Sequence, residues 1–476
     1  MGWRAVISRQ KGEDAVADGA LEAICKAVRE DRQPQPVYVR IANALSSHIS
    51  DGNLKHRAKL PSHRALAEAL GVNVTTVTKA VRFLKDRGVV SAKAGHGTIV
   101  RGKELDHMPP VYERLRTLPR NDLSVVKRQG AVFGEAVSAA IKRVVGNAGT
   151  ISSLREYQPS AGSTDVRQIG SLWLAAAGVK VAPDQIAIAS GAQHALFVAL
   201  AATMKPGDVV LVPSIAYQGI KSAAQMLGLG LIGVDVDDEG IIVSEIERHA
   251  HNPRVRSIYL IPTLDNPRSV TLPLERRKAI AELADRCSLN IIEDDIYRPL
   301  SLIDLPSMIE LYPERTFHVS SVGKVLAPGL RCGFLAYPAV FREIVMQGLR
   351  ATVWMADPLT VSVVQDIIVG GSFRDLVTDL QELLMKRHRV AIELVGNWIS
   401  RHCRPEGNCL WVSLPAEIKA HEMTEYLRME GVGVVPSSVF TIGSAQNNAL
   451  RLYKGSSTDE ASWKDALLLI RRAVEA

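Results

Sequence analysis

The sequence has 476 residues, of which 47% are hydrophobic and 22% charged, and its formal net charge is +7. A chain of this length exceeds one ordinary core, and its apolar content excludes extensive disorder, so we expect at least two folding units. It contains no run of about 20 apolar residues and no signal-peptide core near its start, which predicts a cytoplasmic protein without a membrane partner.

The positive charge is concentrated at the N-terminal end of the chain. Residues 1–100 contain 16 Lys and Arg against 9 Asp and Glu, and the remaining residues contain 41 of each sign. A basic first part favours a polyanionic partner and a neutral second part a small-molecule role, although a solvated basic face is the alternative. The cysteines lack zinc-ligand spacing, so we expect reduced thiols and no metal site; they are Cys25, Cys287, Cys332, Cys403 and Cys409.

The basic part predicts three helices and a β-hairpin. Apolar residues follow helical spacing over 38–49 and stop at a turn-forming Asp-Gly pair. A second helix is expected over 62–71, where a serine can cap its start and a glycine its end. A third is expected over 74–86, and two short apolar runs around a Gly-rich tip predict a hairpin over 89–100.

The outward side of the third predicted helix carries hydroxyls and cations, namely Thr75, Thr76, Thr78, Lys79 and Arg82. Such side chains suit phosphate oxygens and base edges, as in a recognition helix that lies in the major groove. The basic, Gly-rich hairpin tip can approach the DNA backbone or the minor groove.

Residues 37–100 resemble a GntR-type winged-helix domain. The resemblance rests on the motifs LPS-x-R, LA-x-x-LGV, the Thr/Val-rich helix and G-x-G-T. It implies an operator in double-stranded DNA as partner, and contacts from Ser62, Arg64, Thr75, Thr76, Thr78, Lys79, Gly95, His96 and Gly97. A helix-turn-helix that makes only protein contacts remains the alternative.

We predict four segments along the chain. Residues 1–34 form an N-terminal extension to which we assign no function, and residues 35–102 form the winged-helix domain. Residues 103–124 are polar and proline-interrupted, as is typical of a linker. Residues 125–476 form a large domain in which strand-like and helical runs alternate, which predicts an α/β fold with a mainly parallel sheet.

Four predicted strand ends in the large domain carry residues able to do chemistry, and ligands of such folds gather at the carboxyl ends of strands. SGAQHAL, from Ser190, offers backbone amides to a phosphate at a helix start. PTLDNPRSV presents Asn266, although Asn-Pro is also an ordinary turn. IIEDDIYRPL presents Asp294, which if buried needs a cation such as a pyridinium, although acids at strand ends are often structural. HVSSVGKVLAPGLRCGF presents Lys324, an amine able to form a Schiff base or an ordinary surface lysine.

In their order and spacing these motifs resemble fold-type I aminotransferases, and the whole arrangement resembles the MocR branch of GntR-type regulators. The resemblance implies pyridoxal 5′-phosphate as cofactor, with Lys324 in Schiff-base linkage and Asp294 at the pyridine nitrogen. It places Tyr297 and Asn266 at the ring oxygen and Tyr217 on the ring. The phosphate is expected to be surrounded by Gly191, Ala192, Gln193, Ser321 and Arg331.

The same resemblance implies a homodimer and a class of effector. Tyr157 matches a tyrosine that reaches the phosphate of the other subunit, and Arg451 matches an arginine that holds a substrate carboxylate bidentately. Some positions depart from the pattern: Gly323 replaces a serine, Asp265 a glutamine, and Arg268 with Ser269 a Thr-Gly pair. Arg268 could select an acidic ligand, but we favour a solvent-facing side chain.

These features predict a transcription regulator that senses an amino acid or another amine through aldimine formation at Lys324, with little or no enzyme activity. Binding of the effector would have to favour one arrangement of the chain over another. An active aminotransferase with a fused DNA-binding domain is the main alternative, because the same lysine serves as base and as anchor. A scaffold without cofactor that only dimerises is a third possibility.

Overall fold

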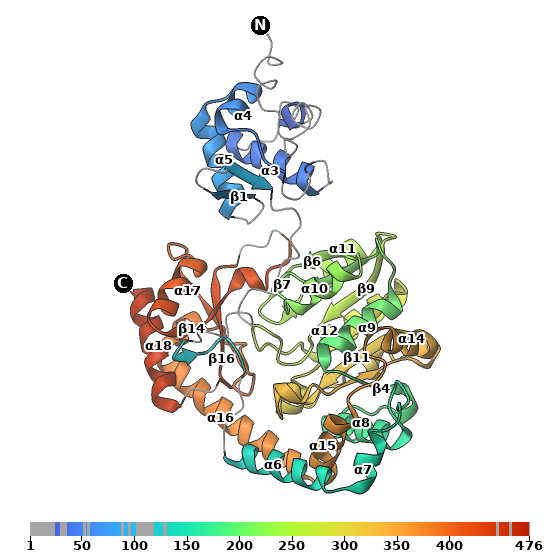
Figure 1. Cartoon of the computed structure of the whole chain (residues 1–476). Coiled ribbons are helices and arrows are strands. Elements are labelled where there is room, and N and C mark those ends of the chain that lie inside the picture. The colour runs from blue at the N-terminus through green and yellow to red at the C-terminus, as the bar shows by residue number, and fades with distance from the viewer. Residues whose placement is uncertain are drawn as a thin grey trace. The chain divides into compact units, whose positions relative to one another are not determined.

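The computed structural model describes residues 24–28, 36–50, 54, 58–86, 90–93, 97–100, 119–126, 131–443, 447–456 and 459–475. The chain divides into two compact units, residues 1–107 and residues 108–476, each described here by itself (Figure 1). Among the described residues, no helix is both long enough and apolar enough to span a membrane.

The N-terminal unit has the three predicted helices, α3 (Val37–Ser50), α4 (His63–Leu70) and α5 (Val74–Asp86). The side chain of Ser62 caps α4 by accepting a hydrogen bond from the Ala65 amide at 3.2 Å. Gly71 ends the helix in the left-handed conformation with φ of 66°, which a glycine adopts without strain. The two predicted caps of α4 are therefore confirmed.

The predicted hairpin consists of β1 (Val90–Lys93) and β2 (Gly97–Val100), which pair antiparallel from Val90 with Val100 to Lys93 with Gly97. A single apolar core joins the hairpin to the three helices. Helical residues 24–28 also belong to this core, since Ile24, Cys25 and Val28 are buried in it. Part of the N-terminal extension therefore packs with the winged helix.

The large unit is built on a seven-stranded sheet of order β4-β12-β11-β10-β9-β5-β6. Only β12 runs antiparallel to its neighbours, so the prediction of a mainly parallel α/β sheet is confirmed. The strands are β4 (Ile186–Ala189), β5 (Val209–Pro213), β6 (Gly230–Val234), β9 (Val255–Leu260), β10 (Asn290–Asp294), β11 (Thr316–Ser321) and β12 (Gly333–Ala336).

Helices cover both faces of this sheet, and successive strand residues point to opposite faces. Val210 and Ile292 belong to the core on one face, whereas Leu211 and Ile291 belong to the core on the other. The first face is covered by α8 (Thr164–Ala176), α9 (Ala192–Thr203), α10 (Gly219–Met226), α14 (Arg342–Thr352) and α15 (Pro358–Val369). The second is covered by α11 (Val243–Ala250), α12 (Leu274–Arg286) and α13 (Met308–Leu311).

A smaller subdomain of the large unit has its own core. Most of its elements follow the large sheet in the chain, and one strand precedes it. The subdomain contains a sheet of order β13-β16-β15, the short pair β3 and β14, and two helices. Its elements are β3 (Asn121–Asp122), β13 (Cys409–Ser413), α17 (Ala420–Met429), β14 (Val432–Gly433), β15 (Val435–Pro436), β16 (Ala449–Tyr453) and α18 (Glu460–Glu475). Residues 121 and 122, in the segment predicted as a linker, are thus a strand of this subdomain.

The long helix α16 (Ser372–Val395) joins the two cores of the large unit. Its first half places Leu376 and Leu380 in the core of the large sheet, and its second half places Ala391 and Val395 in the core of the smaller subdomain. In Figure 1 it runs from α6 (Ala131–Val145) and α15 to α18. The remaining elements are α7 (Ala148–Ser153) and the hairpin of β7 (Val236–Asp237) and β8 (Gly240–Ile241).

Candidate functional site

The residues predicted to bind a cofactor follow the carboxyl ends of five parallel strands. Gly191 follows β4, Tyr217 follows β5, Asn266 follows β9, Asp294 ends β10, and Lys324 follows β11. Four of these strands are direct neighbours in one sheet, and β12 separates β4 from them. Because the five strands are parallel, their carboxyl ends lie at one edge of the sheet. The motifs are therefore gathered at the position where ligands bind in folds of this class.

Asp294 is a buried carboxylate that lacks a charged partner of its own. Oδ2 accepts a hydrogen bond from the Tyr259 hydroxyl at 2.9 Å, whereas Oδ1 is buried without a hydrogen-bond partner. Burial raises the pKa of this carboxyl to about 7, because the surroundings penalise the charged form. A pyridinium N–H would supply both the missing hydrogen bond and the positive charge, so this group fits the pyridine ring of the cofactor.

The residues expected to bind the cofactor's phosphate lie around the N-terminus of α9. Gly191 precedes the helix with φ of 88°, and a Cβ built there would lie 2.5 Å from Nη2 of Arg331. Gly333 approaches the same turn so closely that its own Cβ would lie 2.6 Å from the Gly191 carbonyl carbon. The absence of side chains at both glycines therefore lets the Arg331 guanidinium and β12 approach the N-terminus of α9, so backbone amides and a guanidinium suited to an anion lie close together.

Two further residues of the predicted phosphate site, Gln193 and Ser321, are held by internal hydrogen bonds, and Ala192 opens α9 between Gly191 and Gln193. Gln193 donates from Nε2 to the Gly219 carbonyl at 2.9 Å, and its Oε1 is buried without a hydrogen-bond partner. The Ser321 hydroxyl donates to the Cys332 carbonyl at 2.9 Å and accepts from the Gly323 amide at 3.0 Å. Ser321 thus also fixes the turn that carries Lys324.

Lys324 lies on a short 3-10 helix after β11, and its surroundings include residues that the sequence analysis missed. Its Nζ is 5.4 Å from the centre of the Tyr453 ring. Burial alone would raise the pKa of the Tyr453 hydroxyl, but the cations of Arg451 and Lys324 outweigh it and hold this pKa below its usual value. Tyr453 therefore lies between the two cationic groups of the site.

The predicted ring-oxygen residues Asn266 and Tyr297 are both almost fully buried. Burial raises the pKa of Tyr297 well above its ordinary value, so its hydroxyl stays protonated and can donate. The Cys409 thiol points at Asn266, with 3.7 Å between Sγ and Oδ1. Tyr217 lies beside Gln193 instead, since a Cβ at Gly219 would be 2.2 Å both from the Tyr217 ring and from Gln193 Oε1.

Arg451 is the predicted carboxylate group, and it is 3% exposed on β16. Its guanidinium carbon lies 3.8 Å from the centre of the Tyr453 ring and 5.1 Å from that of Phe440. Nη2 also donates to the Ser124 carbonyl at 3.0 Å. These contacts fix the guanidinium in one orientation, as planar stacking of arginine commonly does.

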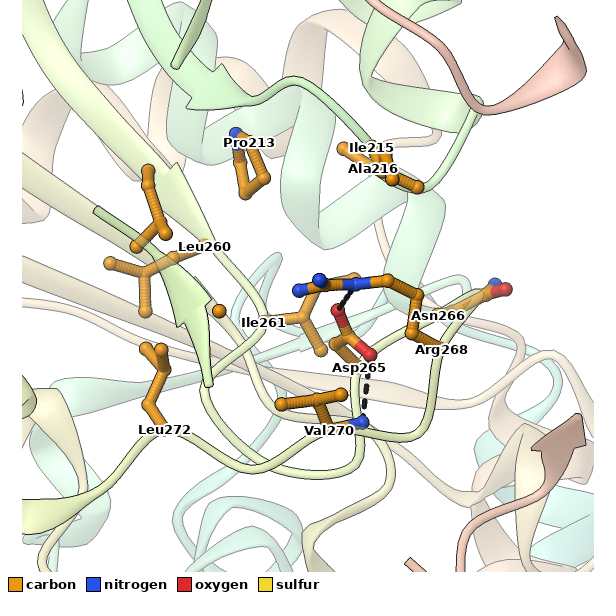
Figure 2. A pocket seen from close by; sticks show the side chains of 12 residues that line it. Pro213, Ile215, Ala216, Leu260, Ile261, Asp265, Asn266, Arg268, Val270 and Leu272 are labelled. Atoms are coloured by element: carbon orange, nitrogen blue, oxygen red, sulfur yellow. Dashed lines mark hydrogen bonds and ion pairs between the residues drawn. The ribbon is translucent and has the colours of Figure 1, made fainter. Parts of the chain in front are cut away.

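The expectation that Arg268 faces solvent is wrong. Its side chain is 11% exposed and forms an ion pair with Asp265, with 3.1 Å between Nε and Oδ2. Nη1 also donates to the Asp237 carbonyl at 2.7 Å. The two departures from the aminotransferase pattern therefore neutralise each other beside a small, mostly apolar pocket that Asn266 also lines (Figure 2).

Ser269, another departure from the pattern, has a structural explanation. It takes a left-handed backbone conformation with φ of 56°, where glycine is usual. Its hydroxyl donates to the Cys409 carbonyl at 2.9 Å and accepts from the Cys409 amide at 3.0 Å. The loop after β9 is thereby fixed to β13, and the two hydrogen bonds offset the strain.

A buried ionic cluster lies beneath the site. His318 Nδ1 lies 2.7 Å from Glu293 Oε2, and Arg298 pairs with Asp295 at 3.3 Å. Burial alone would lower the pKa of His318, but the Glu293 carboxylate outweighs it and raises this pKa above its usual value. Glu293 also accepts from the Met308 amide at 2.7 Å. Glu293 and Asp295, the two carboxylates that flank Asp294, therefore each have a cationic or protonatable partner.

Tyr157, the residue predicted to reach the other subunit, is 81% exposed. Its ring lies 5.8 Å from that of Trp354, which is itself 50% exposed. Other exposed apolar side chains, Ile151, Leu154 and Val353, lie next to them along the chain. An exposed apolar group of this kind is typical of a protein interface.

The N-terminal unit presents most of its predicted DNA contacts to solvent. Ser62, Arg64, Thr75, Thr78 and Lys79 are exposed, and Thr76 is half-buried. Thr75 and Lys79 are four residues apart, so they lie on one face of α5. Val74, the first residue of α5, is also 39% exposed.

Three polar residues on or beside α5 were missed by the sequence analysis or given no contact. Asn73 caps α5, because its Oδ1 accepts from the amide and the hydroxyl of Thr75, each at 2.9 Å. His63 lies 3.2 Å from the Thr78 hydroxyl and so connects α4 to α5. Arg82 is exposed one turn beyond Lys79. The predicted wing-tip residues Gly95 and His96 lie outside the described residues, and Gly97 begins β2.

The fold, the buried Asp294 and the lysine at the sheet edge define a unit of the aminotransferase class, whose cofactor is pyridoxal 5′-phosphate. Residues 117–466 match the family described as aminotransferase class I and II, and residues 37–100 match the bacterial regulatory proteins of the gntR family. The chain belongs to the aminotransferase class I and II family and, with its gntR domain, to the regulators of the MocR type.

Relatives and solved structures agree with this assignment. The chain is 26% identical over 456 residues to the uncharacterized HTH-type transcriptional regulator YdeF of Bacillus subtilis, covering 94% of this chain and 96% of that protein. An archaeal alanine:glyoxylate aminotransferase aligns with a TM-score of 0.69 at 22% identity, over 77% of this chain and 93% of that one. LysN, the α-aminoadipate aminotransferase of Thermus thermophilus, was solved in complex with N-(5′-phosphopyridoxyl)-L-leucine. It aligns with a TM-score of 0.66 at 24% identity, over 74% of this chain and 92% of that one.

Proposed function

We propose that this chain is a transcription regulator whose affinity for its operator changes when a small amino compound binds at the cofactor on Lys324. The observation that carries the proposal is the presence on one chain of an exposed helix with hydroxyls and a cation and of the residues expected to hold the cofactor, gathered at one edge of the large sheet. The helix α5 presents Thr75 and Lys79 to solvent. The site combines Lys324 with a buried Asp294 whose Oδ1 has no hydrogen-bond partner among the described residues.

Pyridoxal phosphate, when bound, supplies an aldehyde carbon at which one amine can replace another. Lys324 is the attachment point in this proposal, and Asp294 holds the proton on the pyridine nitrogen. Tyr297 and Asn266 bind the ring oxygen, and Tyr217 covers the ring. The phosphate is bound by Gly191, Ala192, Gln193, Ser321 and Arg331.

The ligand and the assembly follow from two further residues. Arg451 gives a carboxylate a planar, double-donor partner, so we propose an amino carboxylate as the effector. Tyr157 is so exposed that it can complete the phosphate site of a second copy. A homodimer also suits the operator, because two winged helices then read two half-sites.

The decisive experiment combines absorption spectroscopy with DNA binding. The full chain, Lys324→Ala and the exposed-surface control Lys278→Ala are loaded with pyridoxal phosphate and scanned in the visible range with a panel of amino acids and amines. A visible band is expected in the wild type and the control, and it should be lost or altered in Lys324→Ala. The compound that shifts the band should then change operator affinity; an unchanged affinity at saturation contradicts the proposal.

A second candidate function is an active aminotransferase that has acquired a DNA-binding domain. The observation that favours it is that the lysine, the buried aspartate and the carboxylate-binding arginine of an aminotransferase are all retained as Lys324, Asp294 and Arg451. The two functions differ in turnover. Repeated conversion of an amino donor to its keto product favours the enzyme, and a single spectral change without product favours the regulator.

A further inference from the structure

Residues 121–124, the last residues of the segment predicted as a linker, are anchored in the smaller subdomain. We call these four residues the connecting segment. β3 pairs parallel with β14, and the Leu123 amide donates to the Gly433 carbonyl at 2.8 Å. The Tyr453 amide in turn donates to the Leu123 carbonyl at 2.8 Å. Leu123 therefore bridges β14 and β16, and its side chain is fully buried in the core of the subdomain.

Arg451 contacts the same segment one residue further on. Its Nη2 donates to the Ser124 carbonyl at 3.0 Å, and both residues are buried. The guanidinium also stacks on Tyr453, which lies beside Lys324. The Arg451 guanidinium thus contacts both the Tyr453 ring, which lies beside Lys324, and the Ser124 carbonyl of the connecting segment.

The Ser124 carbonyl is aimed at Arg451 by a side chain of its own strand. Asp122 Oδ1 accepts from the Ser124 amide at 3.0 Å and from the Ser124 hydroxyl at 2.5 Å. Asp122 is buried against Gly433, where a Cβ would lie 2.6 Å from the same oxygen. This local turn fixes the peptide that carries the carbonyl.

We propose that Arg451 couples the ligand site to the connecting segment by exchanging the Ser124 carbonyl for the carboxylate of the ligand. The inference rests on the proposed function and names its regulation. A carboxylate accepts more strongly from a guanidinium than a peptide carbonyl does, so the ligand draws Arg451 away. Residues 121–124 then lose one of the contacts that hold them to β16. An amine without a carboxylate binds at Lys324 but leaves this contact in place.

The first test is hydrogen–deuterium exchange on the full chain loaded with pyridoxal phosphate. The probes are amino acids, each paired with the amine that lacks its carboxylate, such as L-alanine with ethylamine. Both members of a pair are added until the visible spectrum stops changing. We expect the amides of Leu123 and Ser124 to exchange about tenfold faster with the amino acid than with the amine, because local opening is limited by the hydrogen bonds that hold this segment.

The second test uses Asp122, a positioning residue that touches neither cofactor nor ligand. Asp122→Ala releases the Ser124 carbonyl, so the ligand no longer competes with it and should bind about tenfold more tightly, in the range of one charge-assisted hydrogen bond. The affinity of the matched amine should not change. Asp122→Asn keeps an oxygen acceptor and should behave as the wild type, and Ser124→Ala, a milder change, should lie between.

The outcomes separate the coupling from the function on which it rests. Equal exchange with the amine and the amino acid overturns the coupling, as does equal weakening of both ligands in Asp122→Ala, which is the sign of a merely structural role. If no probe shifts the spectrum of the loaded chain, the proposed function fails and the coupling fails with it.

Discussion

The buried Asp294 makes the stability of the cofactor-free chain depend on pH in a predictable direction. Its pKa is raised from 3.8 to about 7 by burial, so the folded chain holds this proton more tightly than the unfolded chain does. Well below pH 3.8 the carboxyl is protonated in both the folded and the unfolded chain, so its ionisation does not lower the free energy of unfolding. As the pH rises from 4 to 7 the unfolded carboxyl ionises first, and stability is lost at about 1.4 kcal/mol per pH unit, to a total of about 4 kcal/mol.

The assay is thermal unfolding of the cofactor-free full chain at pH 5 and pH 8, beside Asp294→Asn. The loss over this range is about 3 kcal/mol, which for a unit of this size lowers Tm by about 4 °C relative to the variant. Asp294→Asn keeps an oxygen that can accept from Tyr259 and cannot ionise, so it isolates this carboxyl from Asp295, whose pKa burial also raises. Cofactor should abolish the difference in the wild type, because a pyridinium then compensates the charge. Parallel Tm values for the two cofactor-free proteins would refute the reasoning.

Three further substitutions test other parts of the chain. Gly191→Ala should weaken cofactor binding, measured by fluorescence titration, because its Cβ would displace the Arg331 guanidinium that we expect at the phosphate; Gly207→Ala, with φ of 92° and nothing within 4 Å, shares the backbone strain and should not. Arg268→Ala should destabilise the chain by about 2 kcal/mol in urea unfolding, because Asp265, 13% exposed, loses its charged partner and keeps only the Val270 amide; Asp265→Gln with Arg268→Thr should recover most of this loss. Lys79→Ala should weaken binding to all DNA sequences and reduce the salt slope by about 1, whereas Lys278→Ala should change neither.

The sequence predicts the elements of this fold well where a local signal sets their ends. The serine cap and the glycine end of α4 lie within the helix's own segment, so the sequence alone specifies both boundaries. The apolar runs of β5 and β10 are likewise explicit, because both faces of these strands are covered by helices. The burial of residues 24–28 against the winged helix has no such local signal, since it depends on contacts with residues far along the chain.

The residues of the candidate site differ in the same respect: local sequence specifies some of them, and only the fold brings in the others. Asp294 and Lys324 stand in motifs that are read as continuous strings, whereas Tyr453 and Cys409 enter the site only through the register of β13 with β16. No spacing in the sequence brings Cys409 to Asn266, which is more than 140 positions earlier in the chain. The misjudged Arg268 shows the same limit, because its partner Asp265 was noted only as a separate departure from the pattern. Seeing the two as one ion pair requires the turn after β9.

The two cores of the large unit explain why a ligand at this site can act on the connecting segment. Lys324 follows β11, and the residues around it pack in the core of the large sheet, whereas Arg451 lies between Leu450 and Leu452 of the smaller core. A ligand held at both groups therefore joins the two cores, which otherwise share the continuous helix α16. Because β3 belongs to the smaller core, a shift of that core against the large sheet would move residues 121–124 with it. Under the proposed regulation, this is the route by which the ligand acts on the segment that leads to the DNA-binding unit.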